Sequence, residues 1–158
     1  KSMKATDLRL GNTIGMLLDD STAIKVTVDI YHLSCILNKS RKYFPIPITT
    51  DELKKLRDNM YDEHTGTSIM NEYDVEEGRW IFGTASYYVF ELKEHEGMKW
   101  VNPDDSPLWK VIAFKPFKKV TSLLEEETLY ARIAYIHELQ NIFHALSESR
   151  EEIQYKKV

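Results

Sequence analysis

Cysteine is nearly missing from this sequence, because Cys35 is the only one among 158 residues. A single cysteine excludes an internal disulfide and any zinc site built from paired cysteines. No apolar run reaches the length of about 18 residues that a membrane-spanning helix needs, and no signal-peptide pattern is present. We therefore expect a cytoplasmic protein that makes no contact with a membrane.

A broad basic surface is also lacking, because 21 basic and 25 acidic side chains give a net charge of −4. Residues 1–48 carry a net charge of +3, residues 49–106 carry −8 and residues 107–158 carry +1. The acidic middle argues against an extended nucleic-acid-binding face. Lys39, Arg41 and Lys42 form one local basic patch. We interpret it as a solvated loop, with a nucleic-acid contact as the less favoured alternative.

The amino-acid composition of the chain is that of an ordinary globular protein with a hydrophobic core. Hydrophobic residues make up 42% of it and charged residues 29%, which is typical of a protein that folds without disulfides or metal. We predict a small β lobe over residues 1–48. Residues 49–158 are expected to hold a helix, an antiparallel meander and a C-terminal helix, and to form one compact unit with the first lobe.

The N-terminal part has the pattern of β-strands. Gly11 and Asn12 stand between two short apolar runs, which indicates a hairpin turn. Residues 23–30 alternate between apolar and polar side chains, as in a strand with one exposed face. We expect residues 31–37 to continue this strand or to pair back on it. The result would be a bent N-terminal antiparallel sheet or partial barrel.

The next segment begins with a rigid connector. Pro45 and Pro47 force extended backbone on the residues before them. Thr50 then has the position of an N-cap, which predicts a short helix over residues 51–60. Residues 73–114 return to short aromatic and β-branched runs separated by turns, which predicts an antiparallel meander of three or four strands.

The C-terminal part favours a long helix. Residues 124–146 contain neither proline nor glycine, and their apolar side chains fall on one helical stripe. The stripe consists of Leu129, Ile133, Ile136, Leu139, Phe143 and Leu146. Such a helix must bury its apolar face, and the strands between Trp80 and Leu92 are the nearest apolar surface. We therefore predict an α+β fold in which this helix packs on the meander.

Residues 137–141 read HELQN, one residue away from the HExxH signature of zinc hydrolases. The signature needs a second histidine where Asn141 stands, and an amide oxygen is a poor ligand for zinc. His144 lies two turns after His137, about 10 Å along a helix axis. We therefore predict no metal and no other cofactor, and interpret His137, Gln140, Asn141 and His144 as a polar flank at the rim of the helix packing.

Three stretches of the sequence resemble a known family. YIHELQNIFHAL at residues 135–146 is similar to the ending hVHQLQNLYFALTGEEL of small uncharacterised proteins of gut Bacteroidota, their mobile elements and phages. LRLGNTI at residues 8–14 resembles that family's LRIGNxV opening, and PIPITTDELKKL at residues 45–56 resembles its PIPLTEEWLLKFGF block. The family's usual glutamine stands where Glu138 sits here. The resemblance implies an accessory role and no catalytic glutamate.

The function most consistent with these patterns is that of a non-enzymatic binding or accessory protein of a phage or mobile element, and we assign no catalytic residue. Its partner would be a protein or a small-molecule ligand. The candidate binding residues are Tyr87, Trp100, Trp109, His137, Asn141 and His144. The three aromatics would form a patch on an uncovered sheet face, although core positions are the more common use of such residues. Two alternatives stay open, namely a hydrolase with a scattered histidine and carboxylate site and a DNA-binding protein that uses the N-terminal β lobe.

Overall fold

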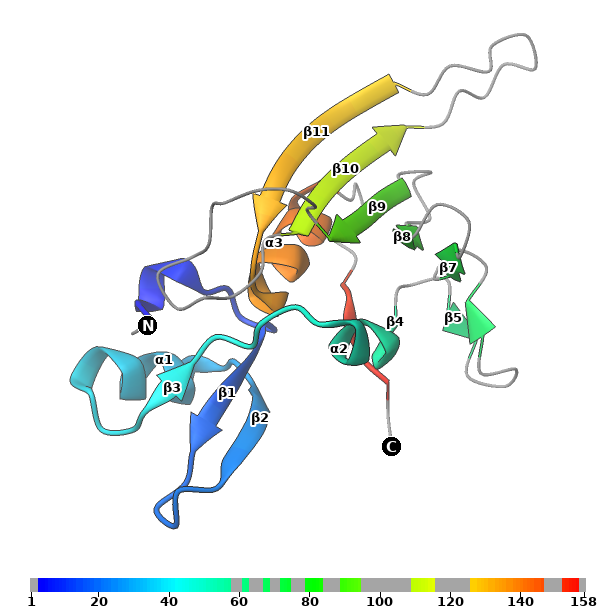
Figure 1. Cartoon of the computed structure of the whole chain (residues 1–158). Helices are drawn as coiled ribbons and strands as arrows, with labels where there is room; N and C mark the ends of the chain where they lie inside the picture. Colours follow the sequence, from blue (N-terminus) through cyan, green and yellow to red (C-terminus); the bar gives the residue numbers. More distant parts are fainter. Residues whose placement is uncertain are drawn as a thin grey trace, which may run out of the picture.

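The computed structural model describes residues 3–57, 61–62, 67–68, 72–74, 79–83, 89–94, 109–115, 126–146 and 152–156. These residues form an α+β fold, in which antiparallel sheets are packed by a C-terminal helix, as the sequence predicts (Figure 1). Within this part of the chain, no helix has both the length and the apolar character needed to cross a membrane.

The N-terminal sheet has the strand order β2-β1-β3, and both pairs are antiparallel. Its strands are β1 (Thr13–Leu17), β2 (Ala23–Thr27) and β3 (Tyr43–Phe44). The hairpin turn predicted at Gly11 and Asn12 is wrong, because residues 8–10 form no strand and the chain turns between β1 and β2 at residues 18–22. Gly15 in β1 lies opposite Phe44, and a Cβ atom at Gly15 would overlap the Phe44 ring. Glycine at this position therefore lets the aromatic ring lie across the strand.

The prediction for residues 31–37 is wrong, because they belong to helix α1 (Ile30–Asn38) instead of a strand. Asp29 caps this helix, since its Oδ1 accepts a hydrogen bond from the backbone N–H of His32 at 2.9 Å. An aspartate directly before an apolar run is a helix-start signal that the alternation of residues 23–30 had hidden. Ile30 is consequently 75% exposed on the helix instead of buried in a strand.

The connector leads into a shorter helix than predicted. Helix α2 spans Thr50–Lys54, and its N-cap is Thr49, whose hydroxyl accepts a backbone hydrogen bond from the first turn at 3.1 Å. The helix does not reach residue 60, because the chain enters strand β4 (Leu56–Arg57). That strand pairs with β12 (Gln154–Tyr155) from the far end of the chain, so a long-range partner overrides local helix propensity.

The second sheet contains the predicted meander. Its order is β11-β10-β9-β8-β7, and all neighbouring pairs are antiparallel. Its strands are β7 (Glu72–Asp74), β8 (Arg79–Gly83), β9 (Val89–Glu94), β10 (Trp109–Lys115) and β11 (Glu126–Ile133). A separate short pair is formed by β5 (Tyr61–Asp62) and β6 (Thr67–Ser68). Consecutive strands of the meander therefore pair as neighbours.

The C-terminal helix is α3 (Ile136–Leu146), shorter than the predicted range of 124–146. Residues 126–133 instead form β11, which pairs with the edge of β10 so that Ile133 lies opposite Trp109. Leu129 and Ile133 lie at helical spacing, and Leu129, Ala131 and Ile133 also lie at every second position, so this stretch fits both periods. The unpaired edge of β10 decided between them, because its backbone groups need partners.

The main core joins α3 to the five-stranded sheet, to α2 and β4 and to the connector, and α3 lies between the two sheets in Figure 1. Its buried members are Ile46, Ile48, Leu53, Leu56, Trp80, Trp109, Val111, Ile133, Ile136, Leu139, Phe143 and Ile153. The helix residues thus share a core with Trp80 of the meander, as expected. A second cluster beneath the N-terminal sheet consists of Ile14, Met16, Val28, Cys35 and Tyr43.

Candidate functional site

Glu138, the acidic residue of HELQN, closes the first turn of α3. Its Oε1 accepts hydrogen bonds from the backbone N–H groups of Ala134 and Tyr135, each at 3.2 Å. A glutamate at the third helical position that reaches back to the residue before the helix is half of a capping box. The carboxylate is therefore engaged by the end of its own helix, which is a structural role.

Gln140 and Asn141 connect α3 to the N-terminal sheet. The fully buried Gln140 accepts a hydrogen bond from the backbone N–H of Thr13 at 2.8 Å through Oε1, and its Nε2 donates to the Ile153 carbonyl at 2.9 Å. Asn141 accepts a hydrogen bond from Nδ2 of Asn12 at 2.8 Å. Both amide side chains therefore link, through hydrogen bonds, segments that are far apart in the sequence.

The three stretches used for the family resemblance meet at the start of α3. The LRLGN stretch reaches the helix through Asn12, as described above. The PIPIT stretch reaches it through the backbone, because Ile48 N–H donates to Ala134 O at 2.8 Å and Ile136 N–H donates to Ile46 O at 2.9 Å. Sheet, connector and helix are thus held together at one junction by these residues.

The two histidines of α3 lie in separate surroundings. His137 is only 6% exposed, and its ring stacks on Tyr135 with centroids 5.9 Å apart. His144 Nε2 lies 3.7 Å from Oε1 of Glu152, a carboxylate that also receives both terminal nitrogens of Arg9, at 2.7 and 2.8 Å. The flank predicted at the rim is therefore buried at His137 and half-buried at His144, because the N-terminal segment covers it.

A small cavity of about 190 Å³ lies beside His137, between the N-terminal segment and the first turn of α3. Its lining includes Asp7, Glu138 and Asn141. Within the described ranges, no group of three histidine, cysteine, aspartate or glutamate side chains is placed to hold a metal ion. Two residues of the near-match to HExxH have structural roles, since Glu138 caps the helix and Asn141 forms a hydrogen bond with Asn12.

Of the three aromatic residues predicted to form a surface patch, the structure describes only Trp109. This side chain is 4% exposed, and its indole Nε1 donates to the Ile48 carbonyl at 3.0 Å. It is therefore a core residue that ties β10 to the connector, and it contributes nothing to an exposed face. Tyr87 and Trp100 lie outside the described residues.

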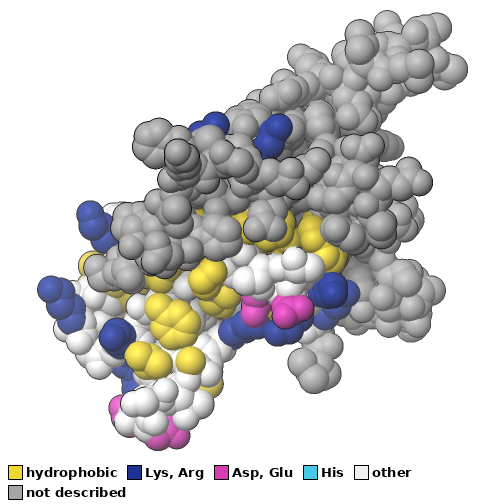
Figure 2. Space-filling view, viewed as in Figure 1, with side chains coloured by type: hydrophobic (Ala, Val, Ile, Leu, Met, Phe, Trp, Pro, Cys, Tyr) yellow, Lys and Arg dark blue, Asp and Glu magenta, His cyan; other side chains and the backbone are white. Residues whose placement is uncertain are grey.

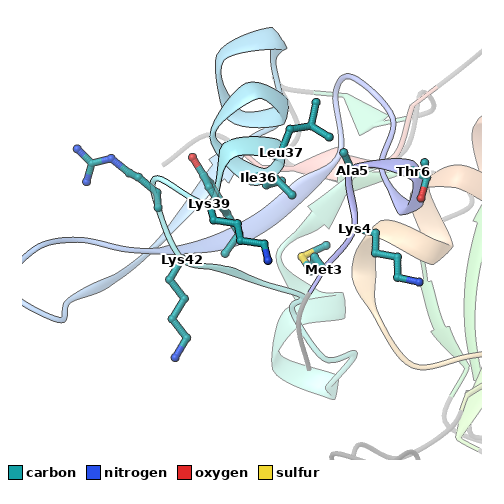
Figure 3. A pocket seen from close by; sticks show the side chains of 10 residues that line it. Met3, Lys4, Ala5, Thr6, Ile36, Leu37, Lys39 and Lys42 are labelled. Atoms are coloured by element: carbon teal, nitrogen blue, oxygen red, sulfur yellow. The ribbon is translucent and has the colours of Figure 1, made fainter.

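The basic patch, by contrast, lines a cavity of about 720 Å³ formed by α1, β3 and the 3₁₀-helix η1 (Ala5–Asp7); we call it the α1 pocket (Figure 3). Its basic side chains are Lys4, Lys39, Arg41 and Lys42. Its apolar side chains include Met3, Ile36, Leu37 and the ring of Tyr43. Figure 3 shows Met3 and Ile36 lying between Lys4 and Lys39. The pocket thus combines an apolar floor with a cationic rim.

The end of α1 places these groups. Lys39 is the C-cap and adopts left-handed backbone with φ of 57°, so the chain reverses there toward β3. Leu37 in the last turn is 74% exposed at the pocket. Arg41 lies 3.6 Å from Asp19, but the Asp19 side chain is almost fully exposed, so this pair neutralises the guanidinium only weakly.

Behind the pocket wall lies the buried thiol of Cys35, which is 5% exposed. A hydrogen bond with Ser40 lowers the pKa of this thiol more than burial raises it. Burial raises the pKa of Tyr43 to about 12. The tyrosine therefore stays protonated at neutral pH. Cys35 belongs to the second core cluster and packs beneath the pocket.

Sequence reasoning located the basic residues but missed the pocket. It treated residues 31–37 as a strand, which would not have presented Ile36 and Leu37 beside Lys39. The missed signal was Asp29 as an N-cap, followed by apolar residues at helical spacing. Lys4 carried no sequence signal at all, since only the tertiary structure brings η1 to the end of α1.

The view in Figure 2 shows hydrophobic side chains over the N-terminal sheet with basic side chains along its border. Acidic side chains occur at the lower tip, where β1 turns into β2. Comparisons of the chain with models of protein families, with curated proteins and with solved structures found no match.

Proposed function

We propose that this protein is a non-enzymatic binding protein, and that its ligand is a small organic anion with an apolar body held in the α1 pocket. The observation that carries the proposal is the lining of this pocket, in which four basic side chains surround an apolar floor. An apolar surface ringed by a few charged groups is the usual design of a small-molecule site.

The size of the pocket supports the same conclusion. Its volume of about 720 Å³ lies within the roughly 300–1,000 Å³ typical of ligand sites. An apolar body would cover Leu37, which is 74% exposed in the free protein. Removing that surface from water would favour binding, and the anionic group would be placed by the lysine and arginine side chains.

The chemistry of the lining favours binding over catalysis. The described lining residues that titrate are lysines, an arginine and Tyr43, whose pKa of about 12 keeps it protonated. General acid–base catalysis works best with a group whose pKa is near the operating pH. An accessory role in a phage or mobile element, as the family resemblance implies, is part of this proposal.

The proposal can be tested with a matched set of three probes. Isothermal titration calorimetry would compare 2-naphthalenesulfonate with 2-naphthol, which lacks the charge, and with sulfate, which lacks the apolar body. We expect the sulfonate to bind at least about tenfold more tightly than either. Lys4→Gln and Lys42→Gln should each weaken it, whereas Lys54→Gln, outside the pocket, should leave it unchanged.

Two results would overturn the proposal. The first is equal affinity for all three probes, or an affinity that the Lys4 and Lys42 variants do not change. The second is tighter binding of a short DNA duplex than of the sulfonate, with an affinity that falls steeply as salt increases. That outcome would favour the alternative in which the N-terminal lobe contacts the phosphates of nucleic acid.

A further inference from the structure

A second cavity, of about 600 Å³, lies where β2, the end of α2 and β12 come together. It shares no lining residue with the α1 pocket, and the two cavities lie toward opposite edges of the N-terminal sheet, whose order is β2-β1-β3. Its basic side chains are Lys25, Lys54, Lys55 and Lys156. We call this cavity the lysine pocket. Its four lysines come from three separate segments of the chain.

Two of these lysines are held in place by specific contacts. Lys25 Nζ lies 2.8 Å from Oε2 of Glu52 and 4.4 Å from the centre of the Tyr155 ring. The Tyr155 hydroxyl donates to the same carboxylate at 2.6 Å. Lys156 Nζ donates to the Lys54 carbonyl at the end of α2, at 3.1 Å. The ordering of these flexible side chains is therefore partly complete before any ligand arrives.

The lysine pocket carries a large local positive charge. Glu52 is the carboxylate that contacts Lys25 and Lys55, at 2.8 and 3.7 Å. Burial raises the pKa of Glu52, but hydrogen bonds with Lys25 and Tyr155 and the positive charges of Lys25 and Lys55 together lower it by more, so the carboxylate is ionised at neutral pH. Among the described residues, the four lysines and Glu52 together carry a net charge of +3, in a chain whose total charge is −4. Figure 2 shows basic side chains beside acidic ones between β2 and α2.

The charged groups of the lining are all of one kind. Lysine ammonium groups are compact point charges that bind phosphate oxygens, and they do not impose the fixed bidentate geometry of the guanidinium fork of arginine. The described lining contains four lysines and no arginine. Thr27 and Gln154 add a hydroxyl group and an amide group as neutral hydrogen-bonding partners. Three excess positive charges match an anion with several adjacent negative charges better than a single phosphate.

We propose that the lysine pocket binds an oligophosphate, meaning two or three linked phosphates that are free or attached to a nucleoside. The phosphate chain would lie among the four lysines and relieve their mutual repulsion. The pocket volume of about 600 Å³ is within the usual range for a ligand of that size. This site is independent of the α1 pocket and does not rest on the function proposed for it.

Isothermal titration calorimetry at constant ionic strength would test the proposal with tripolyphosphate, orthophosphate and citrate. Citrate is the control for charge, because it carries several negative charges on carboxylates. We expect one tripolyphosphate to bind per chain, at least about tenfold more tightly than citrate or orthophosphate. Adenosine triphosphate would show whether a nucleoside adds affinity beyond that of the phosphate chain, and equal or tighter binding would both support the site.

Variants locate the site. Lys54→Gln and Lys55→Gln should each weaken tripolyphosphate binding by about tenfold, since each removes one charge-assisted contact. Lys42→Gln, in the α1 pocket, is the matched control and should not change it. Thermal melts of the three variants show whether each one is folded, so that a loss of binding can be assigned to the missing charge.

Three results would overturn the proposal. Citrate binding as tightly as tripolyphosphate would mean general attraction of anions. Full tripolyphosphate affinity in folded Lys54→Gln and Lys55→Gln proteins would place the anion elsewhere. Tighter binding of single-stranded DNA without a terminal triphosphate, weakened by the same variants, would mean that the lysines contact a nucleic-acid backbone instead of a terminal oligophosphate.

Discussion

Replacing Gln140 by methionine should be among the most damaging single changes in α3. The side chain is fully buried, and its amide joins two segments that are far from the helix in sequence. Oε1 accepts the Thr13 N–H at 2.8 Å, and Nε2 donates to the Ile153 carbonyl at 2.9 Å. Methionine has a similar shape and keeps the packing, but it can form neither bond.

The expected cost follows from the two backbone groups that lose these partners. A buried donor or acceptor without its hydrogen bond costs about 1–3 kcal/mol, so the two together cost about 2–6 kcal/mol. That is a large part of the roughly 5–15 kcal/mol that holds a typical domain folded. In a chain of this length, each kcal/mol lowers Tm by about 2–4 °C. We therefore expect Gln140→Met to lower Tm by about 5–20 °C.

The assay is urea unfolding followed by tryptophan fluorescence, with a thermal melt as a second measurement. Gln154→Met is the matched control, because it makes the same chemical change in a half-buried side chain on β12. We expect the control to change the free energy of unfolding by less than about 0.5 kcal/mol. Both variants should keep the m-value of the wild type, which reports the surface exposed on unfolding.

Gln140→Glu refines the test through its dependence on pH. Glutamate can still accept the Thr13 N–H, but a buried carboxylate cannot donate to the Ile153 carbonyl, and burial raises its pKa. The variant should therefore be least stable at neutral pH and recover as acid protonates it. A Gln140→Met protein as stable as the Gln154→Met control would refute the stabilising role that we assign to the two hydrogen bonds of Gln140.

Three further changes probe the same framework. Glu138→Ala should lower stability by about 1 kcal/mol through loss of the helix cap, whereas Glu138→Gln should be nearly silent because glutamine caps equally well; equal melting temperatures of the two variants would contradict this. Phe143→Ala, at a fully buried position, should cost about 3–5 kcal/mol in urea unfolding. Glu52 has a folded pKa below its ordinary 4.5, because hydrogen bonds with Lys25 and Tyr155 and the charges of Lys25 and Lys55 together lower the pKa by more than burial raises it. Its stabilising effect is therefore present above pH 4.5 and lost as the pH falls through the folded pKa. Melts over a pH series should show the deficit of Glu52→Gln shrinking in acid.

Local patterns in the sequence were sufficient for several elements. The alternation of residues 23–30 predicted strand β2, whereas the hairpin turn predicted at Gly11 and Asn12 is wrong, because the chain turns between β1 and β2 at residues 18–22. The apolar stripe through Ile136, Leu139 and Phe143 predicted the buried face of α3. These elements were predictable because the residues that define them lie within a few positions of one another.

The candidate site was predictable only in fragments. The basic residues Lys39 and Arg41 were visible in the sequence, but their pocket was not, because Met3 and Lys4 complete it from the other side. The lysine pocket had no local signal, since its lysines come from β2, from the end of α2 and from the residue that follows β12. A cavity is a property of surfaces that the fold brings together, so no short window of sequence contains it.

By itself, the sequence determined the α+β class, strand β2 and the apolar stripe of the last helix. The tertiary structure decided the state of segments whose residues fit two periods. Residues 126–133 could satisfy a helix or a strand, and the open edge of β10 made them β11. It likewise decided the roles of Glu138, Gln140 and Asn141. A helix cap and hydrogen bonds between distant segments form only when the fold brings their partners into place. The spacing of apolar residues shows which secondary structures a segment can form. Long-range pairing of its backbone polar groups then determines which of them it adopts.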